Sequence, residues 1–295
     1  MVNATIADDL ISGRHMVNLL GIDFEDWFHP ELIQRHIPTK NNKPTVIHGI
    51  DKILEWLRKN ETFATFFMVG ELLESKPELL DKILGDGHEI GFHTMYHTRL
   101  DTPNFKEKFA EEVKKFDRMT SKKSKGFRAP TFSLNHSSSW AIDVLSDNNY
   151  LYDSSIVPAK TRLYGVPNAE KKPYKISSSM LERNDPNGTI TEFPMLTGKI
   201  FGKTIPVCGG FYLRILPLRI TEEAIRNVNK NNIPASFFIH SWELTPEFMP
   251  KIALPYIDSF ITYHNLGKAL SRMDKLIKKF KFTSFIRYLS EHPSH

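Results

Sequence analysis

Cysteine is almost absent from this sequence. Its 295 residues include a single one, Cys208. No disulfide can therefore form within the chain, which excludes a small secreted scaffold held together by disulfides. Because no second thiol is present to share a metal ion, we interpret Cys208 as a small apolar core residue.

Long apolar segments are also missing. No uninterrupted apolar run approaches the roughly 20 residues that a membrane-spanning helix needs. Residues 1–15 include Asp8 and Asp9 but lack the apolar segment of a signal peptide. We therefore expect a cytoplasmic protein without a transmembrane helix, with peripheral membrane contact left open. Residues 1–15 are expected to form an N-terminal leader segment.

The excess of positive charge is small. The formal net charge is +5, and four lysines fall within residues 275–281. Such a run is most often a solvated helix face, so we expect no nucleic-acid partner. The alternative is a surface for anionic glycan, lipid phosphate or nucleic acid. With 40% apolar and 25% charged residues, the composition is that of a globular chain with one large α/β core or two smaller domains.

Short β-branched and aromatic runs alternate with segments of helical period, which is typical of βα units. The expected strands are 17–22, 64–69, 89–92, 126–128 and 235–239, and the expected helices include 50–57, 75–87 and 105–116. From about residue 164 to 217, Gly, Pro and Ser interrupt short extended pieces, which predicts a β-rich insertion. An apolar stripe from Leu266 to Phe280 predicts helices near the C-terminus.

Acids and histidines follow two of these strands. Asp23, Glu25 and Asp26 come directly after the first, and His93 and His97 follow the third. The carboxyl ends of parallel strands form the ligand crevice of α/β sheets. We expect a spacing of four to place both imidazoles one helical turn apart on one face. Two imidazoles and one carboxylate bind a divalent ion and leave positions open for water and substrate.

Arg128 and His240 occupy two further strand ends. A buried Arg128 next to an acid would keep that acid ionised and oriented, whereas the alternative is a surface ion pair. His240 at the end of an apolar strand can donate a proton, whereas the alternative is a hydrogen-bonded core imidazole.

Taken in order, these strand ends resemble the polysaccharide deacetylase family, also called carbohydrate esterase family four or the NodB-homology group. The resemblance covers residues 18–242 and is carried by Thr65-Phe66-Phe67 with Gly70, Pro77-Glu78-Leu79 and Gly87-His88-Glu89-Ile90-Gly91. A narrower resemblance is to the subgroup found in exopolysaccharide and exosortase-associated gene clusters. It rests on Asp23-Phe24-Glu25-Asp26-Trp27-Phe28, Gly126-Phe127-Arg128-Ala129-Pro130, Gly209-Gly210-Phe211-Tyr212-Leu213-Arg214 and His240-Ser241-Trp242-Glu243-Leu244. The C-terminal extension of that subgroup matches residues 187–282.

The resemblance implies a distorted (β/α)7 barrel with the β-rich insertion and C-terminal helices. The catalytic domain would span residues 16–245, and a helical extension over 246–295 would pack on the barrel. The implied reaction is hydrolysis of N-acetyl groups from an N-acetylhexosamine-containing polysaccharide or its precursor, with release of acetate. The implied cofactor is a divalent metal, zinc by default, although iron, cobalt, nickel or manganese would also suit these ligands.

The resemblance also implies a role for each site residue. The expected general base is Asp23, and the expected metal ligands are His93, His97 and Asp26. Glu25 is the alternative carboxylate ligand, because many relatives have their two acids adjacent or one residue apart. The remaining roles are Arg128 holding Asp23 ionised, the backbone N–H of Thr131 stabilising the oxyanion, His240 protonating the departing amine, and Asp153 tuning His240. An apolar wall for the sugar or the acetyl methyl group would be formed by Trp242, Tyr212 and Phe211.

Two other functions remain open from the sequence. One is a metal-independent amidohydrolase acting on a small ureide or cyclic amide. The other is a catalytically silent module that binds a glycan or nucleic acid through the basic C-terminal helix. The presence of Asp23, His93 and His97 together argues against both, because chains that lose activity normally lose a ligand or the base first.

Overall fold

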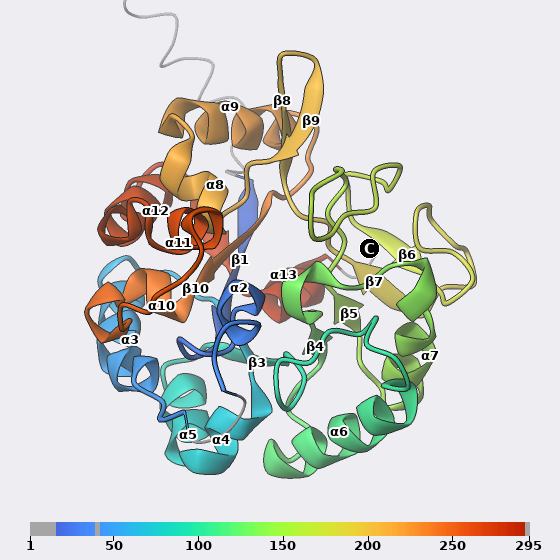
Figure 1. The fold of residues 1–295 in the computed structure, drawn as a ribbon. Helices are drawn as coiled ribbons and strands as arrows, with labels where there is room; N and C mark the ends of the chain where they lie inside the picture. The colour runs from blue at the N-terminus through green and yellow to red at the C-terminus, as the bar shows by residue number, and fades with distance from the viewer. Residues whose placement is uncertain (1–15, 39–41, 293–295) are drawn as a thin grey trace, which may run out of the picture.

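A curled sheet of nine strands forms the centre of the molecule, with helices packed around it (Figure 1). The computed structural model describes residues 16–38 and 42–292. The leader segment expected over residues 1–15 lies outside the described residues. Along the sheet the strand order is β10-β1-β2-β3-β4-β5-β7-β6, and β11 pairs with β1. The strands at the two ends of this order, β10 and β6, do not pair with each other. The sheet is therefore open, and the described strands form a curled half-barrel.

The sheet is almost entirely parallel. Its strands are β1 (Val17–Phe24), β2 (Thr65–Met68), β3 (Glu89–Phe92), β4 (Gly126–Phe127), β5 (Tyr152–Asp153), β6 (Tyr174–Ile176), β7 (Ile190–Glu192), β10 (Ser236–His240) and β11 (Lys281–Thr283). The edge strand β6 runs antiparallel to β7. β1 is buried on both faces, and its residues 19–22 are an apolar run that leads into Asp23.

The helices cover the outside of the sheet and its ends. They are α2 (Glu31–Gln34), α3 (Ile50–Lys59), α4 (Gly70–Ser75), α5 (Glu78–Gly85), α6 (Lys106–Met119), α7 (Trp140–Asp147), α8 (Gly210–Ile215), α9 (Leu218–Asn229), α10 (Ser241–Leu244), α11 (Tyr256–Tyr263), α12 (Ala269–Ile277) and α13 (Phe285–Glu291). The apolar stripes of α3 and α6 are buried against the sheet, as their spacing predicts. None of the described helices has both the length and the apolar character needed to cross a bilayer.

Helix α13 fills the inside of the curled sheet. Phe285 and Tyr288 pack with Phe67, Tyr152 and Phe193 in a cluster of fully buried rings. The backbone N–H of Phe285 donates to the Thr65 hydroxyl at 3.0 Å, which ties the start of α13 to β2. Figure 1 shows α13 near the centre of the molecule, between β1 and the side of the sheet formed by β4 and β5. The C-terminal residues therefore complete the core of the barrel.

The region expected to form a separate β-rich insertion divides between two sheets. β6 and β7 join the main sheet, with β7 parallel to β5. Only β8 (Thr197–Ile200) and β9 (Lys203–Pro206) form a separate hairpin. The region expected to be helical at the C-terminus also contributes β11, whose three residues pair with β1. Cys208 is a buried core residue, as interpreted from the sequence.

Candidate active site

The end of β1 places Asp23 against a buried arginine from the end of β4. Nη1 of Arg128 lies 2.7 Å from Oδ1 of Asp23, and the Arg128 side chain is 0% exposed. Its Nε donates to the Ser154 carbonyl at 2.9 Å, and its guanidinium carbon lies 4.1 Å from the centre of the Phe67 ring. The guanidinium is therefore held in a fixed orientation next to the acid, which does not fit the alternative of a surface ion pair.

Glu25, His93 and His97 form a compact buried group. One ligand atom from each lies within 4.8 Å of the others. Oε2 of Glu25 lies 2.7 Å from Nε2 of His97. This short contact does not have the geometry of a hydrogen bond, so the buried oxygen has no hydrogen-bonded partner among residues 16–38 and 42–292. A buried carboxylate oxygen without a donor is costly unless a cation compensates it, so these residues fit a divalent ion.

The tautomer of His93 also fits a metal ligand. Its Nδ1 lies 2.6 Å from the carbonyl oxygen of Arg128. A carbonyl can only accept, so Nδ1 carries the proton and Nε2 keeps its lone pair. Burial lowers the pKa of His93 to about 4, which keeps the ring neutral. For Glu25, burial raises the pKa, but the neighbouring His97, His240 and His93 together outweigh it, so the net shift of the pKa is downward. Both side chains are thus in the protonation state that a metal requires.

Asp26, the ligand expected from the sequence, has a different environment. Its Oδ1 accepts the backbone N–H groups of Trp27 and Thr45 at 2.9 and 3.0 Å, and its Oδ2 accepts that of Ile47 at 3.1 Å. The carboxylate that lies with His93 and His97 is that of Glu25, so Glu25 replaces Asp26 as the candidate ligand. The reason lies in the local course of the chain. The strand ends at Phe24 and the chain turns, so that Asp26 anchors the following loop.

The two histidines do not lie on a helix, contrary to the expectation from their spacing. His93 follows β3 directly, and the chain then forms a loop in which Thr94 and His97 have φ of 55° and 53°. The loop is held by the side chain of Glu112 in α6, which accepts the N–H of Met95 at 2.9 Å. Two left-handed residues fold the loop back, so the imidazoles converge without a helical turn.

His240 is supported by a buried chain of charged groups. Its Nδ1 lies 2.7 Å from Oε2 of Glu243, and Oε1 of Glu243 lies 2.6 Å from Nε of Arg214. Burial opposes the charged form of His240, but the carboxylates of Glu243, Glu25 and Asp23 together outweigh it and raise the pKa of His240 to about 9. The sequence assigned no role to Glu243 or Arg214, although both stand in motifs that carry the narrower resemblance. A further signal is the spacing of three between His240 and Glu243, which is that of a capping box at the start of α10.

Asp153 was expected to tune His240, but its hydrogen bonds go elsewhere. Its carboxylate accepts the hydroxyl and the N–H of Ser155 at 2.6 and 3.0 Å. Across the sheet it faces Glu192 on β7, and burial raises the pKa of both carboxyls. Glu243 occupies the position beside His240 instead. The difference arises because β7 joins the sheet next to β5, which the sequence does not indicate.

The remaining predicted residues line one pocket together with these groups. It is bordered by Asp23, Glu25, His93, His97, His240, Thr131, Phe211, Tyr212 and Trp242. Trp242 stacks on His240 with ring centres 4.7 Å apart and donates to Oε1 of Glu25 at 2.8 Å. Thr131 has a φ of 52°, a conformation that β-branched residues rarely adopt and that is common at functional sites.

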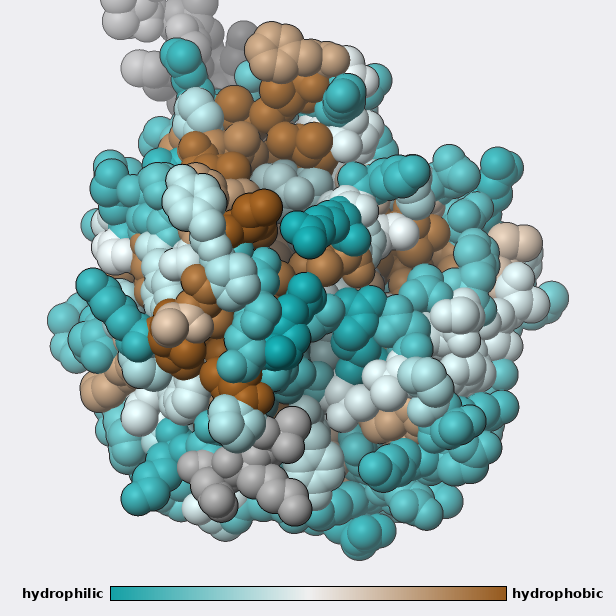
Figure 2. All heavy atoms as spheres, in the orientation of Figure 1, coloured by the Kyte–Doolittle hydropathy of each residue, from teal (hydrophilic) through white to brown (hydrophobic). Residues whose placement is uncertain are grey.

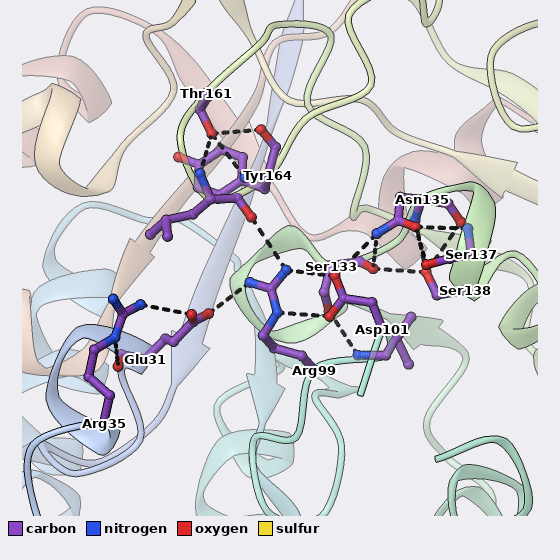
Figure 3. Close-up of polar contacts among 12 residues, drawn as sticks. Glu31, Arg35, Arg99, Asp101, Ser133, Asn135, Ser137, Ser138, Thr161 and Tyr164 are labelled. Carbon is purple, nitrogen blue, oxygen red and sulfur yellow. Dashed lines mark hydrogen bonds and ion pairs between the residues drawn. The ribbon is translucent and has the colours of Figure 1, made fainter. Parts of the chain in front are cut away.

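A polar network fixes two segments of the pocket rim (Figure 3). Arg99 lies 2.7 Å from Glu31 of α2 and 2.7 Å from Asp101, and it donates to the carbonyl of Leu163 at 3.3 Å. Glu31 and residues 161–164 belong to the pocket lining. Arg99 therefore joins two rim segments that are far apart in the sequence.

Comparisons with known proteins concern the family and the fold. A family model described as "Polysaccharide deacetylase" matches residues 47–150, and one described as "Domain of unknown function (DUF3473)" matches residues 154–290. The chain is 46% identical to a peptidoglycan-N-acetylglucosamine deacetylase of Bacillus cereus over 46 residues, which are 16% of this chain and 22% of that protein. It is 38% identical to a chitooligosaccharide deacetylase of Bradyrhizobium sp. over 48 residues, 16% of this chain and 22% of that protein. The matches thus span about a fifth of these curated relatives.

Among solved structures, the fold is similar to that of a Mycobacterium smegmatis protein that has been assigned as a polysaccharide deacetylase. The TM-score is 0.55 at 15% sequence identity, and the match covers 94% of this chain and 90% of that chain. At this identity the likeness concerns the fold, and it confirms the α/β barrel class expected from the sequence.

Proposed function

Because the chain belongs to the polysaccharide deacetylase family, we propose that it hydrolyses N-acetyl groups of an N-acetylhexosamine-containing polysaccharide or its precursor with the help of a divalent metal ion. One observation carries the proposal: the group formed by Glu25, His93 and His97 lies in the same pocket as Asp23 and His240. A metal site, a candidate base and a candidate acid are what amide hydrolysis requires.

Glu25, His93 and His97 are the proposed metal ligands. Zinc is the default ion for two imidazoles and one carboxylate, and iron, cobalt, nickel or manganese would also suit them. When bound, such an ion polarises the acetamide carbonyl and lowers the pKa of the attacking water. Trp242 donates to the second oxygen of Glu25 and so fixes the direction of its carboxylate.

Asp23 is the proposed general base. It accepts a proton as water attacks the carbonyl carbon, and the adjacent guanidinium of Arg128 holds the carboxylate in place. The backbone N–H of Thr131 is the proposed donor to the oxyanion that forms on the carbonyl oxygen. Because a backbone group performs this task, the side chain at this position need only permit the left-handed conformation.

His240 is the proposed general acid. With a pKa raised to about 9, it carries a proton at neutral pH. It gives that proton to the nitrogen as the carbon–nitrogen bond breaks, which yields acetate and a free amine. Glu243 keeps the imidazole oriented, and Arg214 compensates the charge of Glu243.

The aromatic side chains support a sugar substrate. Phe211, Tyr212 and Trp242 line the pocket next to the proposed ligands, and such rings pack against sugar faces or an acetyl methyl group. The names of the relatives support an N-acetylglucosamine unit. The C-terminal match over residues 154–290 supports the subgroup associated with exopolysaccharide gene clusters, so we propose an envelope polysaccharide or its precursor.

Acetate release from a panel of N-acetylated oligosaccharides, with elemental analysis of the purified protein, tests this function. Asp23→Asn should abolish acetate release while sugar binding is retained. His93→Ala and His97→Ala should abolish both bound metal and turnover. Full activity of a metal-stripped sample would contradict the metal-dependent mechanism, and turnover of ureides or cyclic amides in place of acetylated sugars would contradict the substrate class.

A further inference from the structure

The hairpin of β8 and β9 ends in an aromatic residue that contacts solvent on all sides. It projects beside α9 at the top of the molecule in Figure 1. Two residues, Phe201 and Gly202, connect the strands, since Ile200 pairs with Lys203. The side chain of Phe201 is 101% exposed, more than any other large apolar side chain among the described residues.

The local backbone does not favour phenylalanine at this position. Phe201 and Gly202 have φ of 48° and 77°. Two central residues with positive φ match a type I′ turn, in which Asn-Gly, Asp-Gly or Gly-Gly is strongly preferred. Gly202 meets this preference, whereas a bulky aromatic residue with positive φ is unusual. Turn formation therefore does not account for Phe201.

The surroundings of Phe201 give it a chemical context. Figure 2 shows an apolar surface that extends from the tip of the molecule over the segments below it. Ile200 and Ile205 are half-buried in the two strands. Lys199 and Lys203 flank the tip with exposed side chains, and residues 197–206 contain no acid. An isolated exposed apolar residue is ordinary, but an aromatic residue at a projecting tip between two free cations is not.

We propose that this hairpin docks the protein on an anionic lipid bilayer, with Phe201 inserted at the level of the head groups and Lys199 and Lys203 on the lipid phosphates. The charges favour a bilayer over a protein groove, because lysine stems extend along the apolar boundary while their ammonium groups reach anionic head groups. One ring and two lysines provide weak, reversible binding.

The hairpin is also continuous with the active-site pocket. β9 ends at Pro206, and the chain then enters α8, where Gly210, Phe211 and Tyr212 line the pocket. Docking through this hairpin would hold the pocket near the membrane surface. The docking itself does not depend on the proposed catalytic function.

Sedimentation of the full chain with vesicles tests the proposal. We expect binding to vesicles of phosphatidylcholine mixed with phosphatidylglycerol and much weaker binding to phosphatidylcholine alone. Phe201→Asn should lower the partition coefficient about tenfold. Lys199→Gln and Lys203→Gln should each lower it about fivefold on the anionic vesicles only, which corresponds to about 1 kcal/mol per lysine.

The controls separate docking from folding. Phe201→Asn places the preferred Asn-Gly pair in the turn, so its melting temperature should equal or exceed that of the wild type. Phe201→Trp should retain binding and give a blue-shifted emission with anionic vesicles. The double variant Lys122→Gln, Lys123→Gln removes two exposed lysines between α6 and β4 and should bind like the wild type.

Three results would overturn the proposal. The first is unchanged vesicle binding by Phe201→Asn. The second is an equal loss of binding in the Lys122, Lys123 control, which would indicate a general effect of charge. The third is absence of vesicle binding together with a dimer that Phe201→Asn dissociates, which would assign the tip to a second copy of the chain.

Discussion

Glu25 and Asp26 are adjacent in the sequence, yet their carboxylates meet different partners. Glu25 contacts His97 and Trp242, whereas Asp26 accepts three backbone N–H groups. The direction of each side chain depends on where β1 ends and how the chain turns, and the N–H of Glu25 already bonds back to the carbonyl of Asp23 at 3.2 Å. Sequence spacing left both acids as candidates because the position of that turn is set by the tertiary structure.

The two acids should therefore respond differently to the loss of charge. Glu25→Gln should lose the bound metal, because a neutral amide is a poor ligand. Asp26→Asn should keep the metal but lower the free energy of unfolding by about 1–3 kcal/mol, because it leaves a buried backbone N–H without its acceptor. Elemental analysis after dialysis and urea unfolding measure the two effects. Metal loss in Asp26→Asn with retention in Glu25→Gln would reverse the assignment.

His240 and Glu243 should matter only when the leaving group needs a proton. His240→Ala should slow hydrolysis of an N-acetylated sugar by about 100-fold or more, and Glu243→Gln by about tenfold, because both impair protonation of the amine. An aryl acetate, whose phenolate leaves without a proton, should be hydrolysed at nearly the wild-type rate by both variants. Parallel kinetics on the two substrates measure this.

A general loss of activity on both substrates would instead indicate a structural role. Metal content provides the control, since neither variant removes a proposed ligand and both should retain the ion.

At the scale of loops and helices, Arg99 joins α2 to residues 161–164 at the pocket rim (Figure 3). Arg99→Met keeps an unbranched apolar stem but removes the guanidinium group and its hydrogen bonds. We expect KM for an N-acetylated oligosaccharide to rise about tenfold while kcat changes less than about twofold, because substrate contacts are loosened and the reacting groups are not. Arg183→Met, at an exposed position outside the pocket lining, is the matched control. A fall in kcat at constant KM would contradict the rim assignment.

Glu89 links three strands to α13. Its carboxylate accepts the hydroxyls of Thr65 and Tyr152 and the N–H of Ile286 at the start of α13. Burial nevertheless raises the pKa of Glu89 from 4.5 to about 7. Between these two values the folded chain holds a proton that the unfolded chain has released, so the free energy of unfolding falls as pH rises through this window.

This sign gives a measurable pH dependence. Between pH 5.5 and 8, Glu89 should lower the free energy of unfolding by about 2 kcal/mol. The difference in stability between wild type and Glu89→Gln should shift by that amount in favour of the variant over the same range, as measured by urea unfolding. Glu55→Gln, at an exposed position on α3, should show no such shift. An unchanged difference for Glu89→Gln would contradict the raised pKa.

Sequence patterns predicted the elements with strong periodicity and missed those defined by long-range pairing. The buried runs of β1, β2, β3 and β10 and the apolar stripes of α3 and α6 lie close to their expected bounds. Short strands such as β7 and β11 have too few residues to show a period, and their pairing with β5 and β1 gives them their identity. The loop between His93 and His97 was expected to be helical because a spacing of four fits a helix, whereas left-handed residues close the same distance.

For the whole molecule, the expected fold class is confirmed. Its parallel strands bring the residues that follow them to one edge of the sheet. This rule alone brings Asp23, His93 and His240 into one pocket. It does not identify residues whose role depends on a cap or a turn, such as Glu243 and Glu25. The general location of the site therefore followed from the sequence, and its individual contacts required the fold.

The proposed metal ligands come from the end of β1 and the loop after β3, so only the folded chain brings them together. Metal should therefore stabilise the native state by mass action, by about 2.7 kcal/mol when free zinc is 100 times its dissociation constant. For a chain of this size, that corresponds to a rise in melting temperature of roughly 5 °C. Zinc should raise the melting temperature of metal-stripped wild type and of Asp26→Asn alike, but not that of Glu25→Gln. An equal rise in all three proteins would mean that zinc binds at a site that does not include the Glu25 carboxylate.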